Sequence, residues 1–161
     1  MSQIKNKLIL SLMLIFSIFA ILAAYFIQYV LGHKPCNLCL IERLPYFFSI
    51  IIILICLLTQ KFEKITLIIL SLIFFIAALL SFYHFGIEQG FIKESLFCEL
   101  NSENKELTKE ALLNQLKKMP VSCKDVTFKI FGLSLATFNI FISIILSAIT
   151  LKTFLNYEKN K

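Results

Sequence analysis

The stretch LILSLMLIFSIFAILAAYFIQYVL, Leu8 to Leu31, contains no charged side chain. At about 1.5 Å of rise per residue, a helix of this length crosses the roughly 30 Å hydrocarbon core of a bilayer. A cleaved signal peptide is the alternative, with Lys5 and Lys7 as its basic start. The apolar part of such peptides is only about 7–15 residues long. We therefore expect a first membrane-spanning helix at 8–31.

Three more apolar runs follow the first, at 44–58, 65–85 and 128–151. The run at 44–58 is too short to span by itself, so its helix is expected to begin near residue 41. The chain is 58% hydrophobic and 16% charged, whereas an ordinary soluble domain is roughly 45–50% apolar and 25% charged. The sequence predicts an all-α membrane protein: a bundle of four transmembrane helices at 8–31, 41–58, 65–85 and 128–151.

The lysines and arginines predict how these four spans are oriented, because four spans leave both termini on one side of the membrane. The termini and the turn at 59–64 carry basic residues at about twice the density of the two opposite loops, 32–43 and 86–129. We therefore expect a multi-pass membrane protein with both termini cytoplasmic and both loops facing outward; in a bacterial inner (cell) membrane these loops would be periplasmic. This topology explains the net charge of +6, and no nucleic-acid partner is expected.

The second periplasmic loop is the only long segment outside the expected spans. Apolar side chains recur in it at helical spacing before Pro120: Leu107, Ala111, Leu112, Leu116 and Met119. This pattern predicts a short amphipathic helix, either on the membrane surface or solvated within the loop. No internal repeat or Gly/Pro-rich linker divides the chain, so residues 1–161 are expected to form a single domain.

Four of the five cysteines lie in the periplasmic loops: Cys36, Cys39, Cys98 and Cys123. Disulfides persist outside the inner membrane, and four cysteines allow three pairings. Spacing favours Cys36 with Cys39, which leaves Cys98 with Cys123. A disulfide across so short a loop adds little stability and is typical of redox exchange. The longer loop between Cys98 and Cys123 also suits a structural staple.

A zinc site made by the same four thiolates is the alternative to disulfides. It lacks a second tightly spaced pair, because Cys98 and Cys123 are far apart in the sequence, so no metal is expected. The fifth cysteine, Cys56, lies about 20 Å along a helix from Arg43. We expect it to be a small buried hydrophobic residue.

Arg43 follows Cys39 by four residues and Cys36 by seven. The three side chains share a face if the helix begins near the pair, whereas Pro45 favours a regular helix start near Leu44. In either geometry, a helix N-terminus and the guanidinium stabilise a thiolate and an anion on an electron acceptor. A surface arginine that reaches the lipid head groups is the alternative. The chain has no dinucleotide, P-loop or haem signature, so a membrane-soluble quinone is the expected acceptor.

These features together resemble the DsbB family of bacterial inner-membrane disulfide bond formation proteins. The most specific match is PCNLCLIER at 35–43, and the second is PVSCKDVTFKIFGLSLATFN at 120–139. YHFGIEQG at 83–90 is a softer match, and the resemblance covers nearly the whole chain. It implies a thiol:quinone oxidoreductase, an enzyme that supports disulfide bond formation.

The resemblance also implies a role for each periplasmic cysteine. A thioredoxin-fold dithiol of the DsbA type would attack the disulfide of Cys98 and Cys123. The reduced pair would be reoxidised by Cys36 and Cys39, and the electrons would pass to ubiquinone or menaquinone beside Arg43. Two alternatives stay open: a DsbI-like paralogue with a dedicated partner, and a zinc-binding or structural membrane protein.

The last candidate site residue is His84, which lies at the outer end of the third span. Imidazole titrates near neutrality, so His84 could hydrogen-bond a quinone carbonyl or relay its protons. A membrane-interface histidine is the alternative. Glu88 is a weaker candidate for handling protons.

Overall fold

The computed structural model describes most of the chain, namely residues 2–60, 62–93, 123–124, 129–130 and 132–159. Within these residues the protein is mostly helical, and four of its helical segments are long and apolar enough to cross a membrane. The predicted all-α fold with four transmembrane helices is confirmed. The predicted amphipathic helix of the second loop lies outside the described residues.

The described elements follow one another as four long helical segments and a short strand pair. They are α1 (Ser2–Tyr29), α2 (Asn37–Ile41), α3 (Leu44–Thr59), α4 (Glu63–Glu88), β1 (Lys129–Ile130), β2 (Leu133–Ser134) and α7 (Leu135–Lys159). Together α2 and α3 form the second candidate span, Asn37–Thr59.

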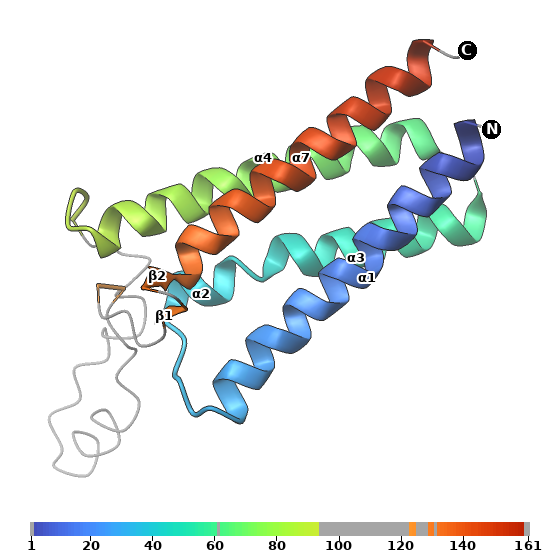
Figure 1. The fold of residues 1–161 in the computed structure, drawn as a ribbon. Helices are drawn as coiled ribbons and strands as arrows, with labels where there is room; N and C mark the ends of the chain where they lie inside the picture. The colour runs from blue at the N-terminus through green and yellow to red at the C-terminus, as the bar shows by residue number, and fades with distance from the viewer. Residues whose placement is uncertain (1, 61, 94–122, 125–128, 131, 160–161) are drawn as a thin grey trace, which may run out of the picture.

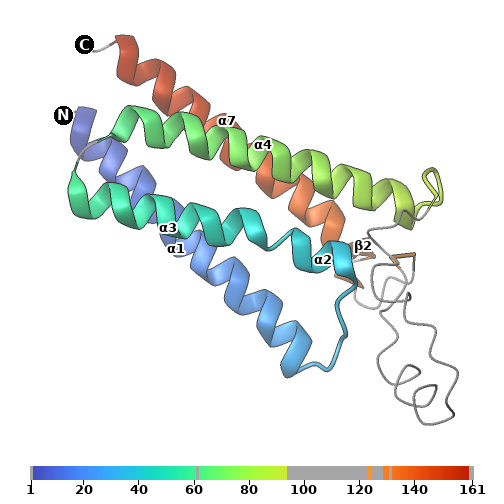
Figure 2. The ribbon, with the colours of Figure 1, turned by 180° about the vertical axis from the view of Figure 1, so that it is seen from behind.

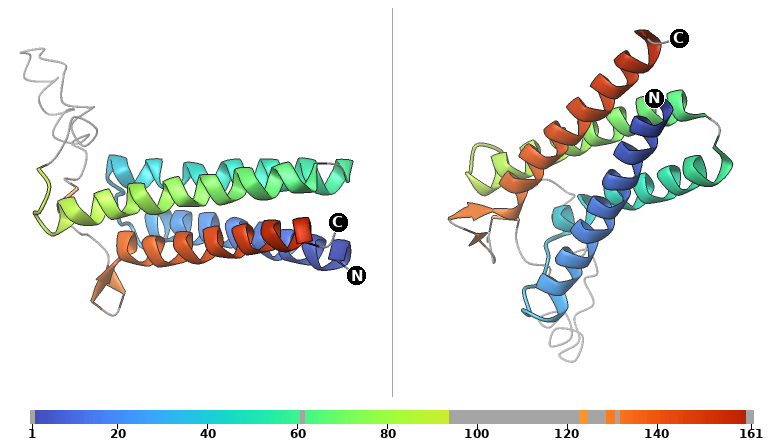
Figure 3. Two further views of the ribbon diagram at one scale, coloured as in Figure 1. Left: turned by 90° about the horizontal axis from the view of Figure 1, so that it is seen from above. Right: turned by 45° about the vertical axis from the view of Figure 1, so that its right-hand side comes forward.

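The long helices run between two ends of the molecule (Figures 1 and 2). Both chain termini lie at one end, and α2, β1 and β2 lie at the other. α7 packs along α4, α1 packs on α3, and α3 also contacts α4. Viewed from above, α3 and α4 form one layer, and α1 and α7 form the other (Figure 3). The two termini therefore share a side, as predicted, whereas their cytoplasmic location stays a prediction.

The core between these helices is apolar near the middle of the bundle. Its fully buried members include Leu10, Ile53, Leu67, Leu70 and Phe74. Short hydroxyl contacts cross it, such as the hydrogen bond from Ser49 Oγ to Ser17 Oγ at 3.1 Å. Large apolar side chains cover much of the outer surface, as expected of helices that face lipid.

The second span differs from the predicted 41–58 at its outer end. A short helix, α2, begins at Asn37 and ends at Ile41, and a break at Glu42 and Arg43 separates it from α3. Pro45 lies in the first turn of α3. Its missing N–H costs no hydrogen bond there, because the first N–H groups of a helix have no partner within the helix. The span therefore starts earlier than residue 41, and of the two geometries considered the helix begins near the pair, because Cys36 caps α2 and Cys39 lies within it.

The fourth span also begins later than the predicted residue 128. Lys129–Ile130 and Leu133–Ser134 pair as antiparallel strands instead. Gly132 turns the chain between them with a φ of 82°, which glycine adopts without steric cost. Ser134 Oγ then accepts a hydrogen bond of 3.2 Å from the Thr137 backbone N–H, an N-cap that starts α7.

The other two spans differ from prediction only at their ends. α1 ends at Tyr29 rather than at residue 31, before Gly32 adopts a φ of 74°. α4 continues to Glu88 rather than ending at residue 85. This extra turn of α4 keeps His84 inside the helix and places Glu88 one turn beyond it.

Candidate functional site

The two cysteines of the tight pair meet at the start of α2. Cys36 is the N-cap, and its Sγ accepts a hydrogen bond of 3.3 Å from the Cys39 backbone N–H. The two Sγ atoms are 2.7 Å apart, longer than the roughly 2.05 Å of a disulfide. Both thiols are free. The structure therefore shows the pair as a dithiol, with Cys36 only 5% exposed.

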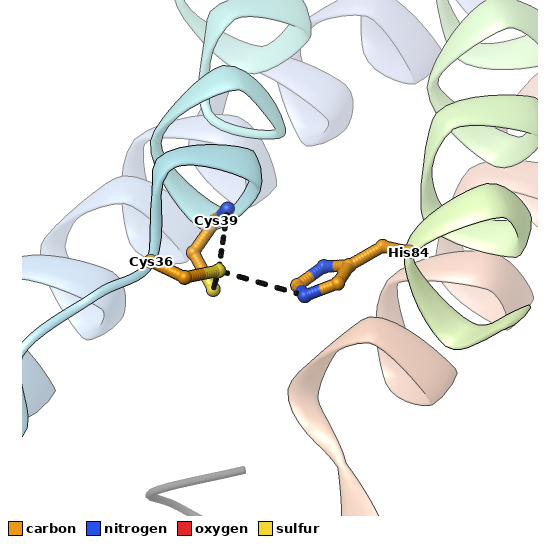
Figure 4. Close-up of side chains that lie close together, drawn as sticks. All are labelled: Cys36, Cys39 and His84. Carbon is orange, nitrogen blue, oxygen red and sulfur yellow. Dashed lines mark hydrogen bonds between the residues drawn. The ribbon is translucent and has the colours of Figure 1, made fainter. Parts of the chain in front are cut away.

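His84 reaches this pair from the last turns of α4, and it is only 2% exposed. Its Nε2 lies 3.5 Å from Cys36 Sγ (Figure 4). Its Nδ1 lies 2.8 Å from Glu42 Oε1. The Nε2 atom is also 3.7 Å from Glu88 Oε1. His84 is thus a buried partner of the thiol rather than an exposed histidine at the membrane interface.

These neighbours make Cys36 acidic for a thiol. The pKa of Cys36 is lowered to about 5, mainly by the side-chain hydrogen bond with Cys39 and also by the hydrogen bond and positive charge of His84, while burial opposes these effects. The thiolate is the form that attacks in disulfide exchange. Cys36 is therefore ready to react at neutral pH.

Glu42 and Asn139 belong to the same cluster, and sequence reasoning missed both. Asn139 Nδ2 donates to Glu42 Oε2 at 3.1 Å and to Ser81 Oγ at 2.7 Å. Tyr46 Oη donates to Asn139 Oδ1 at 2.5 Å. A usable signal was present, because an ionisable or amide side chain within an apolar span indicates a functional site.

Arg43 lies on the other side of the helix break and points towards α1. Its Nη1 donates to Gln28 Oε1 at 2.7 Å. Its guanidinium carbon lies 5.1 Å from the centre of the Tyr25 ring. Two contacts with α1 thus hold the guanidinium in place. This favours a ligand-binding role over an arginine that extends to the lipid head groups.

A cavity of about 380 Å³ joins these groups. Much of its wall is apolar and comes from α1 and α7, including Phe16, Ala20, Ala23, Phe138 and Ile142. Its polar wall contains the candidates predicted from the sequence: Cys36, Cys39, Arg43, His84 and Cys123. The structure therefore brings together every predicted site residue that it describes.

Of the two cysteines of the second predicted disulfide, the structure describes only Cys123. Cys123 is disulfide-bonded, is 3% exposed, and packs in a cluster with Cys36, Leu38 and Ile87. Cys98 lies outside the described residues, so the pairing of Cys98 with Cys123 stays a prediction. What the structure adds is that Cys123 shares a buried cluster and a cavity wall with Cys36.

The same atoms offer a possible metal site. Cys36 Sγ, Cys39 Sγ and a ring nitrogen of His84 lie within 4.8 Å of one another. Two thiolates and an imidazole suit a soft metal ion such as Zn²⁺. This set differs from the four thiolates considered from the sequence, because His84 takes the place of the distant pair.

Comparison with known proteins assigns the chain to a family. The family model described as disulfide bond formation protein DsbB matches residues 6–153. The chain belongs to the DsbB family. This DsbB-family protein is 33% identical over 144 residues to the uncharacterized protein RP370 of Rickettsia prowazekii (strain Madrid E), a match that covers 86% of this chain and 82% of the relative. No solved structure matches it significantly.

Family membership and the four apolar helices identify a multi-pass inner-membrane protein of disulfide bond formation. The DsbB family is in general linked to quinone and to DsbA-like proteins. The Cys36–Cys39 dithiol at the cavity wall suits a disulfide oxidoreductase, because it can exchange two electrons by forming or opening one S–S bond.

Proposed function

We propose that this protein is a thiol:quinone oxidoreductase that reoxidises a periplasmic DsbA-type dithiol and passes the electrons to membrane quinone. One observation carries the proposal: a dithiol with an acidic Cys36 thiol lines a cavity within the apolar bundle, and the disulfide-bonded Cys123 lines the same cavity and belongs to the same buried cluster. In its disulfide form such a site can accept two electrons from the reduced thiols of a neighbouring cysteine pair, and as a dithiol it can release them to a lipid-soluble acceptor.

The cavity suits a quinone in size and in lining. Its volume of about 380 Å³ falls within the roughly 300–1,000 Å³ of small-molecule sites. The apolar side chains of α1 and α7 would hold the ring and tail, and Arg43 would donate to a carbonyl oxygen. A bound quinone supplies an acceptor for two electrons and two protons. Ubiquinone and menaquinone both meet this description.

The proposed electron path begins at the disulfide of Cys98 and Cys123. A thiolate of the partner attacks it, the partner leaves with its own disulfide formed, and Cys98 and Cys123 become thiols. A thiolate of this pair then attacks the Cys36–Cys39 disulfide. Exchange re-forms the first disulfide and leaves Cys36 and Cys39 as thiols, the state in which the structure shows them.

Return of Cys36 and Cys39 to the disulfide releases two electrons and two protons. His84 Nε2, 3.5 Å from Cys36 Sγ, accepts the thiol proton. The carboxylate of Glu42 at Nδ1 stabilises the imidazolium that forms. His84 is thus proposed to handle protons at the sulfur, in addition to the quinone contact expected from the sequence.

The orientation in the membrane follows from the same proposal. The dithiol end must face the periplasm, where DsbA-type partners lie, so the opposite end with both termini faces the cytoplasm (Figure 1). The excess of lysine and arginine near the termini supports this orientation.

The decisive experiment follows quinone reduction in reconstituted vesicles. Purified protein with ubiquinone or menaquinone is given a reduced thioredoxin-fold dithiol, and quinone absorbance is recorded. We expect Cys39→Ser to abolish reduction, because no disulfide can form with Cys36, and the matched variant Cys56→Ser to stay within about twofold of the parent. Undiminished reduction by Cys39→Ser would rule out the proposal. Stoichiometric zinc in the purified protein, without thiol oxidation, would favour the metal-binding alternative.

The identity of the partner needs a separate experiment. A Cys98→Ala variant leaves Cys123 without its predicted disulfide partner, so a mixed disulfide with the attacking protein should accumulate. Mass spectrometry of the trapped complex then distinguishes a general DsbA-type protein from a dedicated, DsbI-type partner.

A further inference from the structure

Glu42 is a carboxylate with both oxygens engaged inside the bundle, where it is only 9% exposed. Oε1 accepts from His84 Nδ1 at 2.8 Å, and Oε2 accepts from Asn139 Nδ2 at 3.1 Å. Burying a carboxylate costs several kcal/mol unless it is paired and hydrogen-bonded. Glu42 and Arg43 lie at the junction of α2 and α3 and point to different helices: Glu42 contacts α4 and α7, whereas Arg43 donates to Gln28 of α1.

Asn139 is held in one orientation by groups from two other helices. Tyr46 of α3 donates to its Oδ1 at 2.5 Å, and its Nδ2 donates to Ser81 of α4 at 2.7 Å. Because a hydroxyl donor occupies Oδ1, the amide must present its N–H groups to Ser81 and Glu42. Asn139 is thus a fixed hydrogen-bond donor that reaches from α7 to the Glu42 carboxylate.

The position of Glu42 determines which ring nitrogen of His84 faces the thiol. A carboxylate can only accept, so Nδ1 must carry a proton, and Nε2 is left as the atom that faces Cys36. The resulting order of sulfur, imidazole and carboxylate is the arrangement by which a third group orients the base of an activated nucleophile.

We infer that Glu42, locked in place by Asn139, is the positioning residue that holds the His84 ring with Nε2 towards the Cys36 sulfur. The inference deepens the proposed function, because it names the residues that keep Cys36 reactive. Neither Glu42 nor Asn139 contacts the sulfur, so both act through His84.

Other ionisable groups surround the dithiol and must be considered in any pH dependence. Those lining the same cavity are His33, Lys34, Cys39, Arg43, Tyr46 and Glu88. Glu88 is the closest competitor of Glu42, since its Oε1 is 3.7 Å from His84 Nε2. Among the described cavity-lining residues, α7 contributes only uncharged side chains.

The test exchanges the two polar groups. Glu42→Gln removes the negative charge, and Asn139→Asp removes the donor. The double variant Glu42→Gln/Asn139→Asp restores an amide facing a carboxylate, but it places the carboxylate away from His84. Carbamidomethylation of Cys36 by iodoacetamide is followed against pH in the reduced, full-length protein, with peptide mass mapping to identify the site.

We expect Glu42→Gln to raise the midpoint of the Cys36 alkylation profile by roughly one pH unit or more. Glu42 touches His84 rather than Cys36, so its loss weakens the imidazolium that stabilises the thiolate. The double variant should recover thermal stability in detergent relative to the single variants yet keep the raised midpoint. Glu42→Asp keeps the negative charge, so its midpoint should rise less than that of Glu42→Gln.

Two results at Glu42 would overturn the inference, and a third at Glu88 would do the same. One is a Glu42→Gln midpoint equal to the parent's, and the other is a double variant whose midpoint returns to the parent's, which is what a purely structural role predicts. A larger shift from Glu88→Gln than from Glu42→Gln would assign the role to Glu88 instead. Ser71→Ala is the matched control, because it removes a contact between α4 and α7 at Ser147 without touching the site.

Alkylation needs neither quinone nor a protein partner. The positioning role can therefore fail while quinone reduction persists. Conversely, the proposed function can fail while the Cys36 profile still depends on Glu42.

Discussion

Neither Cys36 nor Cys56 is part of a disulfide, and the two are almost equally buried, at 5% and 3% exposed. They lie in opposite kinds of surroundings. Cys56 belongs to the apolar core with Leu10, Ile53 and Phe74, whereas Cys36 contacts Cys39 and the His84 ring. Burial alone therefore does not decide what a cysteine does. The groups within hydrogen-bond distance of the sulfur decide it.

The difference extends to the whole of each region. Near Cys56 the helices meet through apolar side chains, which any apolar sequence of suitable volume can supply. Around Cys36 an imidazole, a carboxylate and an amide come from α4, the α2–α3 break and α7. A cluster of this kind is costly inside a membrane, and polar groups there usually mark a functional site.

The largest expected effect comes from removing the imidazole, which makes the surroundings of Cys36 more like those of Cys56. His84→Gln should lower kcat of quinone reduction by about 10²–10³-fold, the usual contribution of a positioned acid or base. KM for the quinone should change much less. The measurement is steady-state quinone reduction in vesicles, and a kcat within twofold of the parent would contradict the role assigned to His84.

The pH dependence of alkylation compares the two cysteines directly. With a pKa of about 5, the Cys36 thiolate is fully formed above pH 6 and is lost as the pH falls through 5. Its reaction rate with iodoacetamide should stay flat from about pH 9 to 6, whereas an ordinary thiol with a pKa near 8.5 slows by roughly a hundredfold between pH 8 and 6. Cys56 should react only after unfolding. Mass mapping of both peptides distinguishes these cases, and a Cys36 rate that falls like that of an ordinary thiol would contradict the prediction.

A smaller effect is expected at Arg43, which belongs to the same cavity but does not touch the thiols through any contact described above. Arg43→Met keeps the aliphatic stem and removes the charge. We expect KM for a short-tailed quinone to rise about tenfold, since a charge-assisted hydrogen bond contributes roughly 1.5–3 kcal/mol. Thiol exchange with the partner, measured without quinone, should be unchanged. An equal loss in both half-reactions would contradict a quinone-specific role.

The smallest effect on activity is expected at Cys56. Cys56→Ala removes one buried sulfur from the apolar core, which should cost about 1 kcal/mol of stability. Quinone reduction should stay within about twofold of the parent. Thermal unfolding in detergent measures the loss of stability, and the vesicle assay measures quinone reduction. A strong loss of activity without a loss of stability would show that the comparison with Cys36 is wrong.

Much of the fold and part of the candidate site could be predicted from the sequence. The four apolar runs predict four spans because a bilayer demands about 20 apolar residues per helix. The spacing of Cys36 and Cys39 identifies a candidate redox pair, and Pro45 predicts the start of α3 near Leu44. The strand pair before α7 was missed, because Ile130 and Leu133 are as apolar as a membrane helix and their hydropathy does not reveal the backbone turn at Gly132.

Sequence by itself determined the membrane class, the four helices and the reactive pair, because hydrophobicity over a helix length and the spacing of two cysteines are local properties. Only the tertiary structure decided that His84 would meet Cys36 and that Asn139 would hold Glu42. These partners are 48 and 97 residues apart, and no local pattern links them. Packing of α4 and α7 against the broken second span brings them together, and the cost of leaving a buried polar group unpaired then fixes their hydrogen bonds.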